Sequence, residues 1–145
     1  MKINIKKLCD NAIVPTYGSQ YSAGADLYAA IDAPVSIDAG QTYLVKTGIA
    51  MEIPTGYVGL VFARSGLASK RGLAPANKVG VIDSDYRGEI MVALHNHSSV
   101  CQTIEVGERI AQISIVPFLS VEFDVVNELS ETERAGGGFG STGRK

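Results

Sequence analysis

The sequence has little cysteine, no long apolar run and almost no net charge, and each shortage excludes a class of protein. Two cysteines cannot build the disulfide framework of a small secreted domain. No apolar stretch approaches the roughly 18 residues of a membrane-spanning helix, and the first residues do not form a secretory signal peptide. A net charge of -2 does not suit binding to a nucleic-acid backbone, which needs a broad basic surface. We therefore expect a cytoplasmic protein that binds neither membranes nor nucleic acid.

The sequence does contain enough apolar residues for one domain. Of its 145 residues, 46% are hydrophobic, which suffices for a single core. Short segments rich in β-branched residues recur between Gly and Pro turn signals, a pattern typical of an all-β sandwich, jelly roll or barrel. The expected strands span residues 42–46, 57–62, 80–83, 89–95, 109–118 and 121–126.

Only one short helix is expected. It runs from Ser65 to Arg71, with Ser65 as its N-cap and Gly72 as its stop. In the expected strand at 109–118, residues alternate between a wetter and a drier face. Gln112 lies on the wetter face, together with Ile110 and Ser114.

The end of the chain differs in composition from the rest. From about Asn127 it is rich in Glu, Ser, Thr, Arg and Gly, and it cannot bury enough apolar area to fold alone. We therefore expect a β domain at 1–126 and a flexible arm at 127–145. The glycines at 138–143 formally match a dinucleotide-binding pattern, but too little chain follows to form the required helix. Glycine N–H groups and the hydroxyls of Ser141 and Thr142 can instead hold a phosphate.

Two internal segments carry side chains suited to chemistry. Arg64, Ser65 and Gly66 place a guanidinium, a hydroxyl and a glycine together, which suits an anion but also fits an ordinary helix cap with a surface arginine. Asp83 ends an expected strand before a polar turn and a returning strand. Its carboxylate can act as a base or bond to N–H groups of the turn. Elsewhere in this turn, Asp85 and Glu89 are interpreted as solvated charges.

The histidines and cysteines are not interpreted as a functional cluster. His95, His97 and Cys101 lie close in sequence, but no further metal ligand is evident, and surface or interface histidines are the better interpretation. Cys9 has no partner base, which favours a small buried side chain over a nucleophile.

Five segments, taken in order, resemble the five motifs of the trimeric dUTP pyrophosphatase family. They are residues 23–27 (AGADL), 64–66 (RSG), 80–88 (GVIDSDYRG), 107–112 (GERIAQ) and 134–143 (RAGGGFGSTG). Each is modest alone, but together they are spread along nearly the whole chain, from Ala23 to Gly143. The resemblance implies a jelly-roll subunit of a homotrimer with three active sites, each at a subunit junction. It also implies that the arm of one chain closes over a neighbour's site.

The resemblance further implies roles for individual residues. Asp83 would be the general base for the water that attacks the α-phosphorus of dUTP, releasing dUMP and pyrophosphate. Uracil and deoxyribose would be held by Asn77, Gly80, Val81, Ile82, Tyr86 and Met91, with Phe139 stacked over the base. The phosphates would be held by Arg64, Ser65, Gly66, Gln112, Arg134, Gly140, Ser141 and Thr142. Mg²⁺ would bind the triphosphate, with Asp26 near it through water.

Three other functions fit part of the sequence. The related dCTP deaminases share the fold but need a glutamate-centred site, whereas Asp83 and the Phe139-bearing tail favour a hydrolase. A non-catalytic nucleotide-binding module would not need Asp83 or Tyr86, and a purely structural trimer would need none of the motifs. One departure from the family is Ala135, where Gly is frequent, and this change removes no hydrogen-bond donor.

Overall fold

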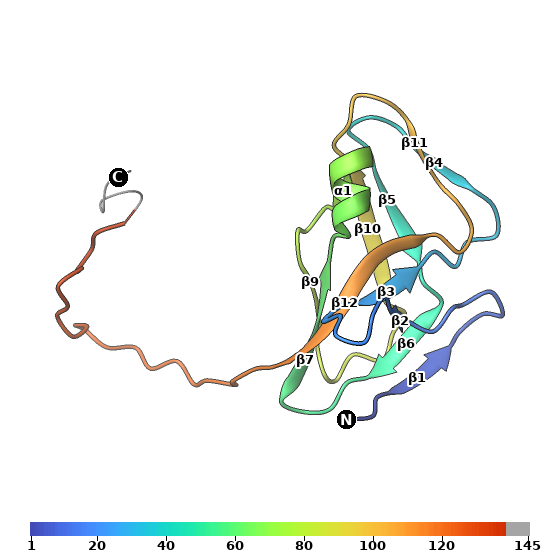
Figure 1. Ribbon diagram of the computed structural model, residues 1–145. Helices are drawn as coiled ribbons and strands as arrows, with labels where there is room; N and C mark the ends of the chain where they lie inside the picture. Colours follow the sequence, from blue (N-terminus) through green and yellow to red (C-terminus); the bar gives the residue numbers. More distant parts are fainter. Residues whose placement is uncertain (139–145) are drawn as a thin grey trace.

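The computed structural model describes residues 1–138, and within that range the chain is mostly β-structure with one short helix, as expected (Figure 1). The elements in chain order are β1 (Asn4–Lys7), β2 (Thr16–Tyr17), β3 (Ala25–Tyr28), β4 (Val35–Ile37), β5 (Thr42–Lys46), β6 (Ile49–Glu52), β7 (Tyr57–Phe62), α1 (Ser65–Arg71), β8 (Leu73–Pro75), β9 (Gly80–Ile82), β10 (Met91–Asn96), β11 (Gln102–Ile104) and β12 (Arg109–Pro117).

The strands form a jelly-roll-like arrangement of antiparallel sheets. The larger sheet has the order β2-β3-β12-β7-β9, and a three-stranded sheet has the order β5-β10-β8. Two strand pairs, β1 with β6 and β4 with β11, complete the domain. Strands that pair are often far apart in sequence, as when β12 pairs with both β3 and β7. These long-range pairings place segments from the whole domain side by side.

One apolar core joins the sheets. The larger sheet contributes Leu27 and Ile113, the three-stranded sheet contributes Val45 and Leu94, and β6 contributes Ile49, all of them buried. The period-2 pattern of each strand turns these side chains inward and leaves the opposite face for polar groups. Candidate functional side chains of the larger sheet therefore lie on its outer face or beyond the ends of its strands.

The predicted strands at 42–46 and 57–62 are confirmed at both ends, and those at 80–83 and 109–118 each extend one residue too far. The prediction at 89–95 begins two residues early and ends one early, relative to β10. The strand predicted at 121–126 is wrong, because this segment pairs with nothing in the described chain and leaves Phe123 and Val125 almost fully exposed. β-Propensity alone does not supply the partner that backbone N–H and C=O groups need.

The expected hairpin around Asp83 is also wrong. β9 pairs with β7 in the larger sheet, whereas β10 pairs with β5 and β8. Residues 83–90 therefore cross from one sheet to the other. Glu89, interpreted above as a solvated charge, is half-buried, and its Oε1 accepts a hydrogen bond from the Gly48 N–H at 2.8 Å.

The helix has its predicted extent but a different start. Its N-cap is Arg64, and no side chain of the described residues gives it a capping hydrogen bond. The assignment of Ser65 as cap is therefore wrong, and Ser65 is the first helical residue. Gly72 ends the helix as predicted, in the left-handed conformation (φ 67°) that suits glycine. Leu67 is the buried residue that packs this helix against the domain.

The alternation predicted for β12 is confirmed from Ala111 onward, where Ala111 and Ile113 are buried and Gln112 is half-buried. Ile110 breaks it, because the strand register shifts between Arg109 and Ala111 and turns Ile110 into the core. A strict two-residue alternation does not predict such a bulge.

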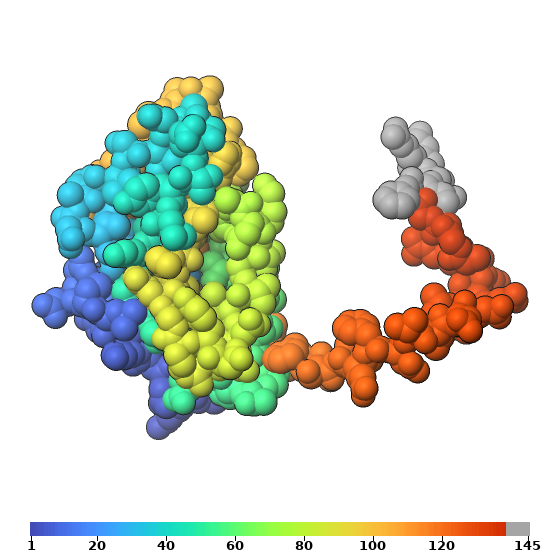
Figure 2. Space-filling model, turned by 180° about the vertical axis from the view of Figure 1, so that it is seen from behind, coloured from blue at the N-terminus to red at the C-terminus, as the bar shows by residue number. Residues whose placement is uncertain are grey.

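Beyond β12, residues 118–138 leave the domain and extend away from it (Figures 1 and 2).

Near the other end of the chain, Cys9 is exposed rather than buried, so its interpretation from residue type was wrong. No helix within residues 1–138 is long and apolar enough to cross a membrane.

Candidate functional site

An open pocket of about 230 Å³ lies where the chain crosses between the two sheets. Leu44 of β5 and Met91 of β10 form one wall, and β9 and the following turn form the rest. Five residues expected to be functional line this pocket together: Val81, Ile82, Asp83, Tyr86 and Met91. Its lining is largely apolar, with Asp83 and Glu89 as its acidic residues.

The turn after β9 fixes Asp83 and Tyr86 relative to each other. The Tyr86 N–H donates to the Asp83 carbonyl at 3.2 Å, and the Tyr86 hydroxyl donates to the Glu89 carbonyl at 2.9 Å. A Cβ on Gly88 would stand 2.4 Å from the Tyr86 hydroxyl oxygen, so glycine leaves room for the ring. The Asp83 side chain is exposed and accepts no hydrogen bond within residues 1–138, which leaves it available to a water molecule.

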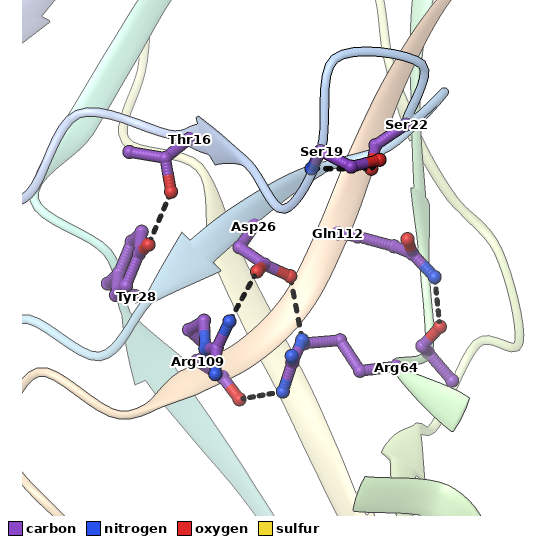
Figure 3. Close-up of polar contacts among 9 residues, drawn as sticks. Thr16, Ser19, Ser22, Asp26, Tyr28, Arg64, Arg109 and Gln112 are labelled. Carbon is purple, nitrogen blue, oxygen red and sulfur yellow. Dashed lines mark hydrogen bonds and ion pairs between the residues drawn. The ribbon is translucent and has the colours of Figure 1, made fainter. Parts of the chain in front are cut away.

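A second polar cluster lies on the outer face of the larger sheet. Asp26 is buried, with 8% of its surface exposed, and its two carboxylate oxygens pair with two arginines (Figure 3). Arg64 Nε donates to one oxygen at 2.7 Å, and Arg109 Nη1 donates to the other at 3.3 Å. The two guanidinium groups compensate the charge of this buried carboxylate. In turn, the carboxylate holds the Arg64 side chain in one place.

Gln112 lies beside this cluster, because it faces Asp26 across the β12–β3 pairing. Its Nε2 donates to the Ala63 carbonyl at 2.8 Å (Figure 3). A Cβ on Gly24 would lie 2.5 Å from Gln112 Oε1 and 3.1 Å from its Cδ. Glycine at position 24 therefore leaves room for the carboxamide of Gln112.

The remaining candidate residues occupy three other places. Ser65 and Gly66 are exposed at the start of α1, next to Arg64. Asn77 is exposed in the turn before β9, close to the buried Gly80. Arg134 lies on the extended arm, where its Nε donates to the Gly137 carbonyl. The other expected arm residues lie outside the described part of the chain; they are Phe139, Gly140, Ser141 and Thr142.

The Asp26 cluster bears on the expected metal ion. Residues 1–138 contain no group of three His, Cys, Asp or Glu side chains that could hold a metal. Asp26 already uses both oxygens in arginine pairs, so it does not suit direct coordination of a bare cation. Carboxylate oxygens have further lone pairs that can accept from metal-bound water. The residues fit a hydrated Mg²⁺ held mainly by the substrate and not a protein cage.

His97 is exposed and His95 is half-buried, with their ring centroids 4.4 Å apart. Thr42 Oγ1 lies 2.9 Å from His95 Nδ1. Desolvation lowers the pKa of His97, and the nearby His95 and Lys78 lower it further. Cys101 is an exposed free thiol whose pKa is raised, chiefly by its hydrogen bond to the Asp38 carboxylate.

Sequence reasoning missed several contributors to these sites. Arg109 belongs to a recognised motif but received no role, although its place beside Gln112 was a usable signal. Leu44 and Glu89 line the pocket around Asp83. Leu44 carried no signal, because its place depends on the pairing of β5 with β10, which are distant in sequence.

Comparison with known proteins gives one consistent result. The family model described as dUTPase matches residues 10–143. A Hydrogenobaculum protein named deoxyuridine 5'-triphosphate nucleotidohydrolase is 50% identical over 145 residues, covering 100% of both chains. The Acinetobacter baylyi protein of the same name is 44% identical over 150 residues, also covering both chains completely.

Solved structures agree with this result. The dUTPase of Staphylococcus bacteriophage 80alpha in complex with dUpNHpp has a TM-score of 0.91 and 32% identity, and the match covers 98% of each chain. A mutant dUTPase of the S. aureus phage phi11, described with a structural Mg(II) ion, has a TM-score of 0.80 and 27% identity. That match covers 88% of the present chain and 98% of the phage chain.

Proposed function

This chain belongs to the dUTPase family and hydrolyses dUTP, and we propose that Asp83 is the general base of the reaction. The observation that supports this role most directly is the pocket at the β9 turn. It places an exposed carboxylate next to Val81, Ile82, Tyr86 and Met91, in a space with the mixed apolar and polar lining of a small-molecule site.

In the proposed reaction, Asp83 accepts a proton from a water molecule while the oxygen of that water attacks the α-phosphorus. The bond from the α-phosphorus to the bridging oxygen breaks, and pyrophosphate leaves with that oxygen while dUMP remains. A carboxylate at the end of a strand, whose side chain accepts no hydrogen bond within residues 1–138, can orient such a water. Hydrolysis lowers the dUTP available for incorporation into DNA and supplies dUMP for thymidylate synthesis.

The choice of base and sugar is proposed to depend on the walls of the same pocket. Backbone groups of 80–82 and the Asn77 amide would read the polar edge of uracil. Tyr86 is held against Gly88 by its hydroxyl contact with Glu89, so its ring can form a firm floor under the deoxyribose. Under a bound deoxyribose, a ring fixed in this way would exclude a 2′-hydroxyl, which is the proposed basis of selection against ribonucleotides.

The phosphate chain is proposed to bind at Arg64, Ser65, Gly66 and Gln112. The Asp26 pair fixes the Arg64 guanidinium, and Gln112 fixes the Ala63 carbonyl just before it. Pre-positioned donors stabilise developing phosphate charge without reorganising during the reaction. When bound, Mg²⁺ would neutralise charge on the triphosphate, and Asp26 would face it through water.

We propose that the working form is a homotrimer in which each site uses more than one chain. Asp83 follows Ile82, which pairs with Gly59, whereas Arg64 lies beyond Phe62 at the other end of β7. Asp83 thus stands opposite Val58, six residues before Arg64, and at about 3.3 Å per residue the two are roughly 20 Å apart along the strand. The α- and γ-phosphorus atoms are joined by only a few bonds, so they lie much closer together than these two residues. This difference supports a site completed by Arg64 of a neighbouring copy.

The extended arm fits the same proposal. Residues 118–138 run away from their own domain, so an arm that closes over a site would reach another subunit (Figure 2). Arg134 would bring a cation to the phosphates, and residues 139–142 would cover the nucleotide. The cytoplasm remains the proposed location, supported by two cysteines that are both free thiols.

The experiment that tests the base is Asp83→Asn. We expect dUTP binding, measured by calorimetry, to persist and pyrophosphate release to fall by about 10² to 10⁴, the usual contribution of a general base. Asp85→Asn is the matched control, because Asp85 is an exposed carboxylate of the same turn. Unchanged turnover in Asp83→Asn would reject the assignment.

Subunit mixing tests the shared site. Asp83→Asn and Arg64→Ala trimers should each be nearly inactive alone, while co-refolded mixtures should recover activity at sites that combine one intact Asp83 with one intact Arg64. If no mixture regains activity although subunits exchange, each site would have to be built from one chain.

A further inference from the structure

Helix α1 is fixed at both ends by two adjacent residues, Glu108 and Arg109. At its start, Arg64 Nη1 donates to the Arg109 carbonyl at 3.4 Å, and both arginines share Asp26. At its end, Arg71 Nη1 lies 2.5 Å from Glu108 Oε1. The residues at the start of β12 therefore contact both ends of the helix.

The contact at the end of the helix is extensive. Besides Glu108, the Arg71 guanidinium donates through Nε to Gln102 Oε1 at 3.1 Å and through Nη2 to the Thr103 carbonyl. Glu108 is fully engaged too, because its Oε2 accepts from the Glu105 N–H at 2.9 Å. The side chains of Arg71 and Glu108 are 30% and 22% exposed, so solvent screens this pair only in part.

The helix depends on such contacts for its position. Its seven residues are too few for stability in isolation. Within residues 1–138 no side chain caps its N-terminus, and Leu67 is its buried residue. Packing of one leucine leaves a short helix free to tilt, whereas a planar guanidinium that binds three acceptors defines one orientation.

We propose that Arg71 and Glu108, called here the helix clamp, are positioning residues for the triphosphate site. They do not touch substrate. The clamp fixes the far end of α1, so that Arg64 and Ser65 at the near end keep their places relative to Gln112. The inference rests on the proposed phosphate-binding role of this segment. A displacement of about 1 Å at such a site can cost as much as about 10²-fold in rate.

The test compares kcat and KM for dUTP in Arg71→Met, Glu108→Gln and the double variant. We expect kcat/KM to fall about tenfold to a hundredfold in each single variant. The double variant should be little less active than the less active single variant, because both changes break the same ion pair. Binding of dUMP, which lacks the β- and γ-phosphates, should stay unchanged. Lys70→Met is the control, since Lys70 is exposed in the same helical turn and makes no ion pair within residues 1–138.

Hydrogen exchange at the Ala68 and Gly72 amides gives a readout independent of activity, and it should accelerate in both single variants. Glu108→Gln is the milder change, because glutamine still accepts from Glu105, and it keeps the test usable if Arg71→Met folds poorly. Faster exchange with unchanged kinetics would overturn the proposal, as would strictly additive losses in the double variant. A wild-type chain inactive on dUTP would instead contradict the proposed function itself.

Discussion

Asp26 and Gln112 are direct partners in the antiparallel pairing of β3 with β12, and they hold two consecutive residues ahead of α1. Asp26 holds the Arg64 side chain at 2.7 Å, while Gln112 holds the Ala63 backbone carbonyl at 2.8 Å. Directly opposed residues of an antiparallel pair share a face, so the sheet itself sets this geometry. The proposed phosphate-binding segment is thus attached to the most extensive sheet of the domain.

Gly24→Ala should weaken dUTP binding with little effect on folding. The added Cβ would meet Gln112 Oε1 at 2.5 Å, and this flexible side chain can swing away at small cost, breaking its bond to Ala63. We expect KM for dUTP to rise about tenfold, equivalent to roughly 1.4 kcal/mol, and Tm to change little. Gly18→Ala is the control, because its Cβ would meet nothing closer than 3.8 Å. Unchanged KM in Gly24→Ala would mean that the position of Gln112 does not matter.

Asp26→Asn should destabilise the fold. The substitution removes the charge that two arginines share at a buried position, and an amide presents N–H groups toward one of them. The free energy of unfolding should fall by about 1–3 kcal/mol. Urea unfolding at one fixed protomer concentration measures this, with Asp32→Asn as a control at an exposed carboxylate. Equal stability of Asp26→Asn and wild type would show that the cluster contributes nothing to folding.

Removal of the arm should separate assembly from activity. A chain that stops after Glu133 keeps every strand of the domain, so it should fold and assemble. It loses Arg134 and the glycine-rich segment, and we expect pyrophosphate release to fall about 10²-fold or more. A chain that stops after Gly143 is the control for loss of the two terminal cationic residues, Arg144 and Lys145. Full activity in the shorter chain would remove the arm from the mechanism.

The Cys101 thiol should react slowly at neutral pH. The Asp38 carboxylate raises its pKa by accepting its hydrogen bond, so the thiolate, which is the reactive form, is scarcer at any pH below that pKa. Asp38→Asn should lower the pKa, speed alkylation and shift the pH–rate curve of Cys101 toward lower pH. Cys101→Ser identifies the signal of this thiol against that of Cys9. Coincident curves for wild type and Asp38→Asn would contradict the proposed influence of Asp38.

The sequence predicted local features better than long-range ones. The strands at 42–46 and 57–62 and the stop at Gly72 depend on nearby residues, and all three are confirmed. Segments such as β2 and β8, with two and three residues, are too short to show a period. The strand predicted at 121–126 has a suitable composition, but the described chain offers it no partner.

The same difference between local and long-range features holds for the residues of the candidate sites. Asp83 and Tyr86 were named from a motif and Met91 from the family resemblance, and the structure brings them into one pocket. Leu44 and the clamp of Arg71 with Glu108 were not named, because each role depends on a contact between distant segments, whereas Arg109 received no role although it lies in a recognised motif. The Asp26 ion pairs could not be read from spacing either, since Asp26 and Arg109 are 83 residues apart.

Pyrophosphate release from dUTP, dCTP, dTTP and UTP, measured in parallel with Mg²⁺ and with a chelator, tests the function most directly. We predict release from dUTP alone, strengthened by Mg²⁺, because the pocket at Asp83 would select uracil and exclude a 2′-hydroxyl. Equal release from UTP or dTTP would contradict this assignment of the pocket. No release from any of the four would contradict hydrolysis itself.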